Sequence, residues 1–79
     1  MVSDKLTKLI LNELNLKTFD FRDDTVASQV PGWDSYSHIN IILAVEEEYN
    51  IHFKTDEILK IRKKNIGELQ TLIDSKSNN

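Results

Sequence analysis

The chain has 79 residues, of which 39% are hydrophobic and 29% are charged, and this balance predicts one globular domain over residues 1–79. Thirteen acidic and ten basic residues give a net charge of −3, and the absence of cysteine excludes disulfides, thiolate metal sites and cysteine nucleophiles. Two histidines are too few for a histidine-rich metal site or a histidine-based catalytic apparatus, so we expect neither a metal site nor an enzyme active site.

Charge is unevenly distributed along the chain. Residues 34–59 contain six acidic residues and one basic residue, whereas residues 60–79 contain five basic residues and two acidic ones. The acidic middle argues against a nucleic-acid partner, and the short basic run at 62–64 fits the solvated end of a helix. No apolar stretch approaches the roughly 20 residues of a membrane span, and the N-terminus lacks a secretory pattern. We therefore expect a soluble, cytoplasmic monomer.

An apolar pattern at helical spacing predicts a first helix near residues 4–15, with Ser3 as its N-cap. The apolar residues of this helix are Leu6, Leu9, Ile10 and Leu14. Residues 16–33 show no sustained period and contain the single proline, Pro31. A loop this long in so small a domain is uncommon unless it is organised or functional, and its hydrophobic side chains should pin it to the helices. These side chains are Phe19, Phe21, Val26 and Val30.

Asp34 or Ser35 should cap a second helix that runs to about Tyr49. A short third helix is predicted to follow, because Thr55 offers a cap and the next two residues, both acidic, suit a first helical turn. The apolar residues of this third helix are Ile58, Leu59 and Ile61.

Asn65 and Glu68 have the spacing of a capping box and open a last predicted helix. Residues 75–79 are typical of a frayed tail. The inner side of the last helix would carry Ile66, Leu69, Leu72 and Ile73. The fold class expected from these elements is all-α, a small four-helix bundle with a long first loop and a short third helix.

The second predicted helix carries two apolar stripes at about 100° per residue. The obvious core face consists of Ile41, Ile42, Val45 and Tyr49. The second stripe consists of Tyr36, Ile39 and Leu43, and Glu46 and Glu47 flank it. Either the helix is central and both stripes are buried, or the second stripe is a docking surface. Apolar side chains beside carboxylates would suit a basic, hydrophobic groove on a partner.

Ser35 lies at the start of the second helix, where a serine most often serves as a cap. The same position suits a phosphodiester, because the backbone N–H groups at the start of a helix attract phosphate. His38 lies three residues along, but no acidic residue is placed to orient it as a base for the hydroxyl. Any modification of Ser35 would therefore need another enzyme.

The stretch from Gly32 to Tyr36 reads Gly-Trp-Asp-Ser-Tyr, and Ala-Val-Glu-Glu-Glu-Tyr follows at residues 44–49. These residues, with His38 and Ile39 between them, resemble the attachment region of acyl carrier proteins. In that family an Asp-Ser-Leu motif opens the second helix and acidic residues close it. The order of helices, long loop and motif is similar to the family over almost the whole chain.

The resemblance implies that the chain is an acyl carrier and not an enzyme. It implies 4′-phosphopantetheine attached to Ser35, with Asp34 as the usual neighbour, and a thiol that holds acyl intermediates as thioesters. It also implies partner docking through the second stripe, Tyr36, Ile39 and Leu43, and through the acidic Glu46 and Glu47. The expected partners are a phosphopantetheinyl transferase and the enzymes that load, modify or transfer acyl groups.

Several positions depart from the carriers of fatty-acid synthesis. Tyr36 stands where leucine is usual, Ser37 and Asn40 stand where acids are frequent, and residues 60–64 are more basic. These departures favour a discrete carrier of a specialised pathway, such as polyketide synthesis, aminoacyl transfer or polysaccharide modification, over general fatty-acid biosynthesis. Two alternatives stay open. A peptidyl carrier of a nonribosomal-peptide-like pathway shares the fold and the serine, and an unmodified helical adaptor could use the same acidic, apolar helix to grip a partner.

Overall fold

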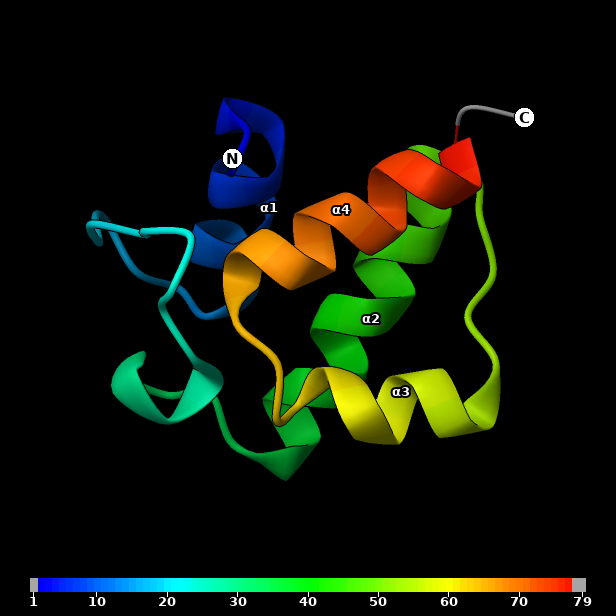
Figure 1. Ribbon diagram of the computed structural model, residues 1–79. Helices are drawn as coiled ribbons and strands as arrows, with labels where there is room; N and C mark the ends of the chain where they lie inside the picture. The colour runs from blue at the N-terminus through cyan, green and yellow to red at the C-terminus, as the bar shows by residue number, and fades with distance from the viewer. Residues whose placement is uncertain (1, 78–79) are drawn as a thin grey trace.

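A computed structural model describes residues 2–77, which form α1 (Asp4–Glu13), the 3₁₀ turn η1 (Ala27–Gln29), α2 (Ser35–Tyr49), α3 (Thr55–Ile61) and α4 (Ile66–Ser77). In Figure 1, α2 runs through the middle of the molecule, α4 crosses it above, and the short α3 lies across its lower end. Over this part of the chain the only strand-like pairing is an isolated bridge between Val26 and Asn65. The expected four-helix, all-α architecture is therefore confirmed.

The helix ends follow the local capping signals at two of the predicted positions. The Ser3 side chain accepts a hydrogen bond from the Leu6 N–H at 3.2 Å and caps α1. Asn65 and Glu68 form the expected capping box, with reciprocal side-chain to backbone bonds of 2.8 and 3.0 Å. The first helix ends at Glu13, slightly earlier than expected, because Asn15 turns into the left-handed region with φ of 56°.

Two sequence-based predictions about helix ends are wrong. Thr55 is the first residue of α3 and not its cap; Lys54 occupies the cap position, and the Glu57 carboxylate accepts a hydrogen bond from the Lys54 N–H at 2.8 Å. The tail expected to fray from residue 75 is helical to Ser77, while residues 78–79 lie outside the described residues. Lys76 explains this extension, because its Nζ lies 3.0 Å from the Glu57 carboxylate and 5.5 Å from the centroid of the Phe53 ring.

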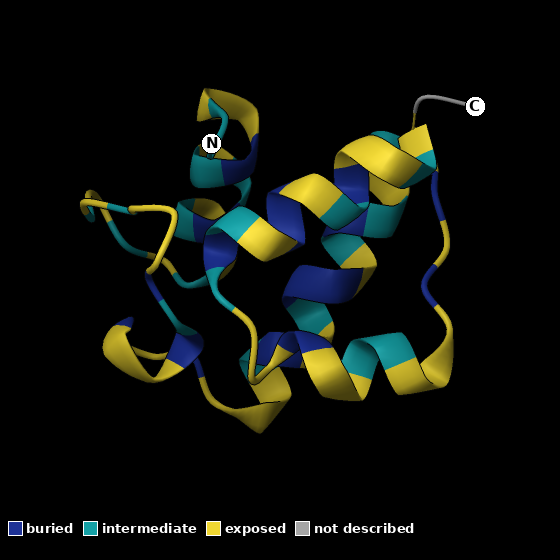
Figure 2. Cartoon of the chain, in the orientation of Figure 1, coloured by how far each residue is buried: buried dark blue, intermediate teal, exposed yellow. Residues whose placement is uncertain are grey.

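The core is built where all four helices face one another, as the dark-blue segments of Figure 2 show. α2 contributes Ile41, Ile42 and Val45, each at most 1% exposed, so its predicted core face is confirmed, with Tyr49 half-buried at the edge. The other buried apolar residues of the described chain are Leu6, Ile10, Ala27, Val30, Trp33, Ile51, Phe53, Ile61, Ile66, Leu69 and Ile73.

The long first loop is organised and closely tied to α4. Phe19 and Phe21 pack partly buried against the core with ring centroids 4.9 Å apart, and Val30 is buried. The Thr25 carbonyl accepts the Ile66 N–H at 2.7 Å, and the next helical N–H, that of Gly67, donates to a loop carbonyl at 2.9 Å. The loop therefore supplies hydrogen-bond acceptors to the otherwise unpaired N–H groups at the start of α4.

Gly67 is needed for this close approach of α4 to the loop. A Cβ placed on Gly67 would lie 2.9 Å from both the Cβ and the carbonyl oxygen of Asp23. We expect Gly67→Ala to lower the free energy of unfolding by about 1–3 kcal/mol, because the loop has to shift. The cost of shifting the loop should outweigh the advantage of about 1 kcal/mol that alanine has over glycine inside a helix.

Urea unfolding followed by circular dichroism measures this effect. Ser75→Ala, at an exposed position of the same helix, is the matched control and should change stability by no more than about 0.5 kcal/mol. A Gly67→Ala chain as stable as the wild type would show that the shift of the loop costs no more than the helix advantage of alanine, about 1 kcal/mol.

Candidate functional site

The first turn of α2 projects from the end of the long loop. Asp34 is its N-cap, and the Asp34 carboxylate accepts a hydrogen bond from the Ser37 N–H at 2.8 Å. The hydrogen bond from the Ser37 backbone N–H is the main cause that holds the pKa of Asp34 below its usual value. A hydrogen bond from the Ser37 side chain contributes less to the same shift. Ser35 is thus the first helical residue and not the cap, and its side chain is exposed.

A basic side chain from the end of α3 meets Ser35. Arg62, the residue that follows α3, donates a hydrogen bond from its Nη1 to the Ser35 Oγ across 27 positions of sequence. Residues 62–64 were expected to form the solvated end of a helix, so this contact is not among the sequence-based predictions. Nothing local in the sequence signals it, because only the packing of α3 against α2 brings the two residues together.

One turn further along α2, His38 is buried at 3% exposure and bridges three elements. The indole Nε1–H of Trp33 donates to the His38 Nδ1 at 3.1 Å. Indole nitrogen is a donor only, so the imidazole proton resides on Nε2, which donates to the Ile58 carbonyl oxygen at 3.0 Å. The chain of bonds from Trp33 through His38 to Ile58 ties the loop, α2 and α3 together.

These bonds define the protonation state of His38. Burial lowers the pKa of His38 below its usual value of 6.5, the hydrogen bond to the Ile58 carbonyl opposes that shift, and the positive charge of Arg62 lowers the pKa further. Both nitrogens of the neutral ring are engaged, so neither is free to accept a proton from Ser35. His38 is a structural group that supports the first turn of α2.

The second stripe of α2 faces solvent. Tyr36 is 79% exposed, Ile39 48% and Leu43 56%, so the alternative in which both stripes are buried is wrong. On α3, Leu59 is also exposed, at 70%, although its neighbours Ile58 and Ile61 pack inward. Four large apolar side chains on α2 and α3 therefore remain uncovered by the described part of the chain.

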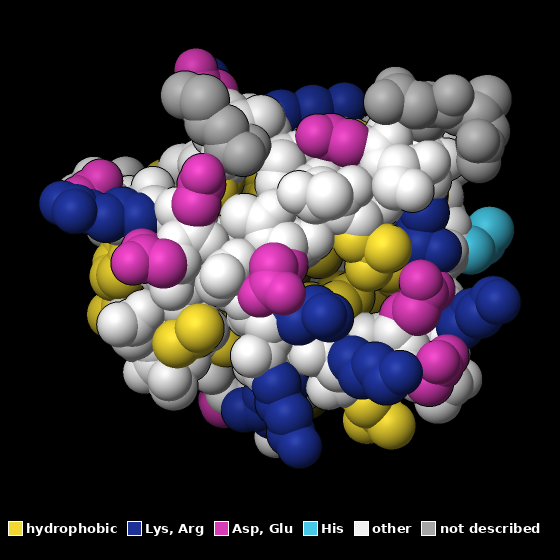
Figure 3. Space-filling model, in the orientation of Figure 1, with side chains coloured by type: hydrophobic (Ala, Val, Ile, Leu, Met, Phe, Trp, Pro, Cys, Tyr) yellow, Lys and Arg dark blue, Asp and Glu magenta, His cyan; other side chains and the backbone are white. Residues whose placement is uncertain are grey.

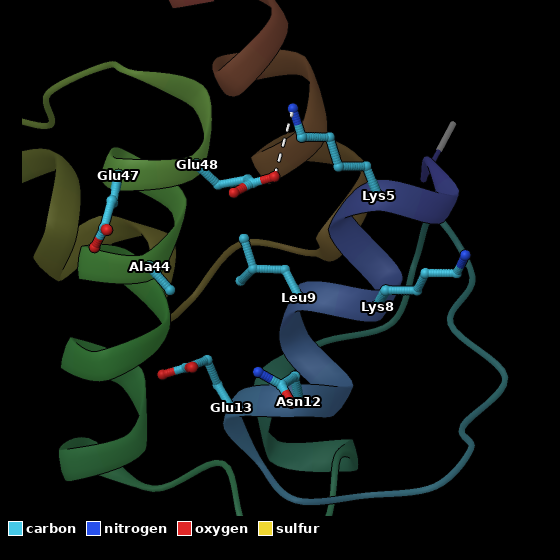
Figure 4. Close-up of a pocket in the computed structure, with 8 residues that line it drawn as sticks. All are labelled: Lys5, Lys8, Leu9, Asn12, Glu13, Ala44, Glu47 and Glu48. Atoms are coloured by element: carbon cyan, nitrogen blue, oxygen red, sulfur yellow. Dashed lines mark ion pairs between the residues drawn. The ribbon is translucent and has the colours of Figure 1, made fainter.

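The two glutamates flanking the second stripe are in different situations. The Glu46 carboxylate accepts a hydrogen bond from the Phe53 N–H at 2.8 Å, and this side chain is only 19% exposed. Glu46 thus anchors the segment between α2 and α3. Glu47 is exposed and lies at the rim of a shallow groove between α1 and α2, on the side of α2 away from α1 (Figure 4).

That groove encloses about 450 Å³ and lies toward the far end of α2 from Ser35. Its wall has mixed charge: Lys5 reaches Glu48 at 3.9 Å, as the dashed line in Figure 4 shows, and places its Nζ 4.5 Å from the centroid of the Tyr49 ring. The groove is lined by Lys5, Lys8, Leu9, Asn12, Glu13, Ala44, Glu47 and Glu48.

Within residues 2–77 no group of three or more His, Asp or Glu side chains is arranged to hold a metal ion. None of the helices in this range has the length and the apolar character that a membrane span requires.

No family model matches the chain. Among solved structures, the solution NMR structure of the holo acyl carrier protein from Geobacter metallireducens superposes with a TM-score of 0.82. The two chains are 34% identical over 92% of this chain and 82% of that one. This chain belongs to the acyl carrier protein family. Membership was expected from the Asp-Ser motif and the acidic end of the second helix, and the comparison confirms it.

The buried neutral His38 should make this family member sensitive to mild acid. Because folding lowers the pKa of His38 from 6.5, the unfolded chain binds the proton more readily. The stabilising contribution of His38 should be complete above about pH 6.5 and should be lost as the pH falls below it. Thermal unfolding at intervals from about pH 7.5 to about pH 5 measures this loss above the range in which carboxylates protonate.

His38→Gln should remove most of this decline. At neutral pH it should cost about 1–3 kcal/mol, because the Trp33 indole N–H or the Ile58 carbonyl oxygen is left without its hydrogen bond. His52→Gln is the matched control, since the His52 side chain is 96% exposed, and it should keep the decline. A His38→Gln chain with an unchanged pH profile would assign the acid sensitivity to other groups.

Proposed function

We propose that the chain is a carrier that bears 4′-phosphopantetheine on the Oγ of Ser35 and presents acyl groups to partner enzymes. The observation that carries this proposal is the exposed hydroxyl of Ser35 on the first turn of α2, directly after the Asp34 cap, in a member of the acyl carrier protein family. The solved relative is the holo form of such a protein, which supports the same cofactor here.

The surroundings of Ser35 fit a phosphodiester. The hydroxyl is exposed, so a second enzyme can reach it, and the guanidinium of Arg62 already contacts its oxygen. The position at the start of a helix of 15 residues adds the favourable field of the helix dipole for an anion. When bound, the arm supplies a thiol that holds an acyl group as a thioester.

The chain itself supplies the nucleophilic oxygen but no base for it. His38, three residues away, has both ring nitrogens engaged with Trp33 and Ile58. In the modification the Ser35 Oγ would form a bond to the β-phosphorus of CoA, the bond from that phosphorus to 3′,5′-ADP would break, and the hydroxyl proton would pass to a base of the phosphopantetheinyl transferase. The engaged ring nitrogens of His38 support this division of roles.

The second stripe is the proposed docking surface. Its three apolar side chains, Tyr36, Ile39 and Leu43, lie exposed on the helix that begins with Ser35, so a partner that binds them also reaches the arm. Glu47 is available for steering, whereas Glu46 has one carboxylate oxygen engaged with the Phe53 N–H. We assign Glu46 a mixed role, in which it shapes the segment after α2 and contributes negative charge to a partner.

The cargo we propose is an acyl group of a specialised pathway, handled in the cytoplasm by a monomeric carrier. The polar Ser37 and Asn40 and the basic residues after α3 support this choice over general fatty-acid synthesis. They are also compatible with an aminoacyl cargo on a peptidyl carrier. An unmodified adaptor would use the same exposed stripe but would take up no arm, so the modification assay separates the adaptor from either carrier.

Incubation with CoA, Mg²⁺ and a broad-specificity phosphopantetheinyl transferase should add one phosphopantetheine to the chain. Intact-mass spectrometry measures the addition. Ser35→Ala should abolish it, since the attacking oxygen is removed, and should leave the helical circular dichroism unchanged. Ser37→Ala, two residues along the same helix, is the matched control and should still be modified. Labelling that persists in Ser35→Ala would place the attachment elsewhere.

Truncating a docking residue of α2 and truncating a core residue of α2 should have different effects on stability. Leu43→Ala, at an exposed position, should change the free energy of unfolding by no more than about 0.5 kcal/mol. Ile42→Ala, at its buried neighbour, should cost about 2–5 kcal/mol. The rate of modification at subsaturating carrier should nevertheless fall for Leu43→Ala, because truncating an interface side chain commonly costs about 1–4 kcal/mol of binding. A wild-type rate would remove Leu43 from the docking surface.

A further inference from the structure

We propose that Arg62 binds the phosphodiester that joins the arm to Ser35 and thereby restrains the arm against α3. This proposal rests on the proposed modification of Ser35. It assigns Arg62 a role as a positioning residue, acting on the direction in which the arm leaves the protein rather than on the chemistry of its attachment.

The geometry carries this inference. The Nη1 of Arg62 already donates a hydrogen bond to the Ser35 Oγ, the atom that becomes the bridging oxygen of the phosphodiester. The phosphorus is bonded directly to that oxygen, so the non-bridging oxygens lie within reach of the same guanidinium. No change in the helices is needed to make the contact.

A guanidinium is well suited to this task. It is planar and always charged. Its N–H donors form a fork that matches the oxygens of a phosphate, so one edge of the guanidinium can bind two oxygens at once. In the unmodified chain the guanidinium faces a neutral hydroxyl, which is a weak partner for a cation. Attachment of the arm would replace this hydroxyl by an anion and strengthen the contact.

The position of Arg62 in the fold also favours a defined contact. Arg62 follows directly on α3, and α3 is held against α2 by the bond between the Ile58 carbonyl and His38. On the face shown in Figure 3, Lys and Arg side chains gather over α3 and the turn after it. Two of these lysines are engaged with neighbouring carboxylates, Lys60 with Asp56 at 4.0 Å and Lys64 with Glu68 at 3.6 Å. Arg62 is the one for which the structure shows a contact to Ser35.

The experiment compares the phosphodiester in three loaded chains. Wild type, Arg62→Gln and Lys63→Gln are each loaded to completion with CoA, Mg²⁺ and excess transferase, and intact mass verifies one arm per chain, so differences in loading rate do not enter. Lys63→Gln removes one positive charge from the adjacent exposed position and is the matched control. The readouts are the ³¹P NMR signal of the phosphodiester and the melting temperature of each loaded chain minus that of its unloaded form.

We expect Arg62→Gln to shift and narrow the ³¹P signal, because the phosphate is no longer held, while Lys63→Gln keeps the wild-type signal. Loading should raise the melting temperature of the wild type by roughly 1–5 °C, the scale of an exposed ion pair in a domain of this size, and Arg62→Gln should lose most of that rise. Arg62→Lys, which keeps the charge without the fork, should give an intermediate signal. It also serves as the test should Arg62→Gln fail to fold. Higher salt should move the wild-type signal toward that of Arg62→Gln.

Three outcomes would overturn the proposal, and they are distinguishable. A wild-type chain that takes up no arm would refute the proposed function, and the role of Arg62 with it. Fully loaded chains in which Arg62→Gln and Lys63→Gln give the wild-type ³¹P signal and the wild-type rise in melting temperature would refute the role of Arg62 alone. Equal changes in both variants would show that only the general positive charge of this region acts on the phosphate.

Discussion

The structure depends on one constraint: the first turn of α2 has to stay in place although Ser35, its first residue, is exposed to solvent. An exposed first turn cannot be held by burial of its own side chains. The hydrogen bonds from Trp33 to His38 and from His38 to Ile58 hold this turn from the buried side of α2, one turn away from the exposed hydroxyl. Since an unpaired polar group in this buried position costs about 1–3 kcal/mol, the three elements are coupled through a single imidazole ring.

This arrangement divides α2 into two sides with different tasks. The side that carries Ile41, Ile42 and Val45 is covered by the other helices, whereas Tyr36 and Leu43 stay in solvent. Both sides are apolar, so composition alone left open whether the helix was central or half-exposed. The three-dimensional arrangement decides, because the exposed fractions of the side chains show that the rest of the described chain covers only one side of α2. The uncovered side begins beside the residue proposed to carry the arm.

The sequence was sufficient for features that depend on residues a few positions apart. The Ser3 cap and the Asn65–Glu68 capping box were predicted because each bond spans three residues. The cap of α3 was misplaced by one residue, since the Glu57 carboxylate accepts the Lys54 N–H and Lys54 takes the cap position. Leu59 could not be classified in so short a helix, where a single turn of apolar residues leaves its inner face undefined.

The remaining features of the site depend on packing between distant segments. The Asp-Ser motif identified Ser35 as the candidate, but no pattern pointed to Arg62, 27 positions away. Trp33 and His38 were each visible in the sequence as an aromatic residue and a lone histidine. Their pairing requires the loop to turn into α2 at the Asp34 cap, and the neutral state of His38 requires the carbonyl of Ile58 from α3. Contacts of this kind become visible only once the short helix has been placed.

The placement of α3 also determines the electric field along α2. Through its contact with α2, α3 brings Arg62 to Ser35, while Glu47 and Glu48 stand near the opposite end of the helix. The surface along α2 therefore carries both the Arg62 guanidinium and the Asp34 carboxylate where the arm would be attached, and acidic side chains alone farther along, with exposed apolar side chains between. Because charges at an interface mainly orient the approaching partner, such a gradient distinguishes the two directions in which an enzyme could lie along α2. A carrier with acids along the whole helix offers no such distinction. Here the same short helix that supports the first turn of α2 would also give the proposed docking surface a direction.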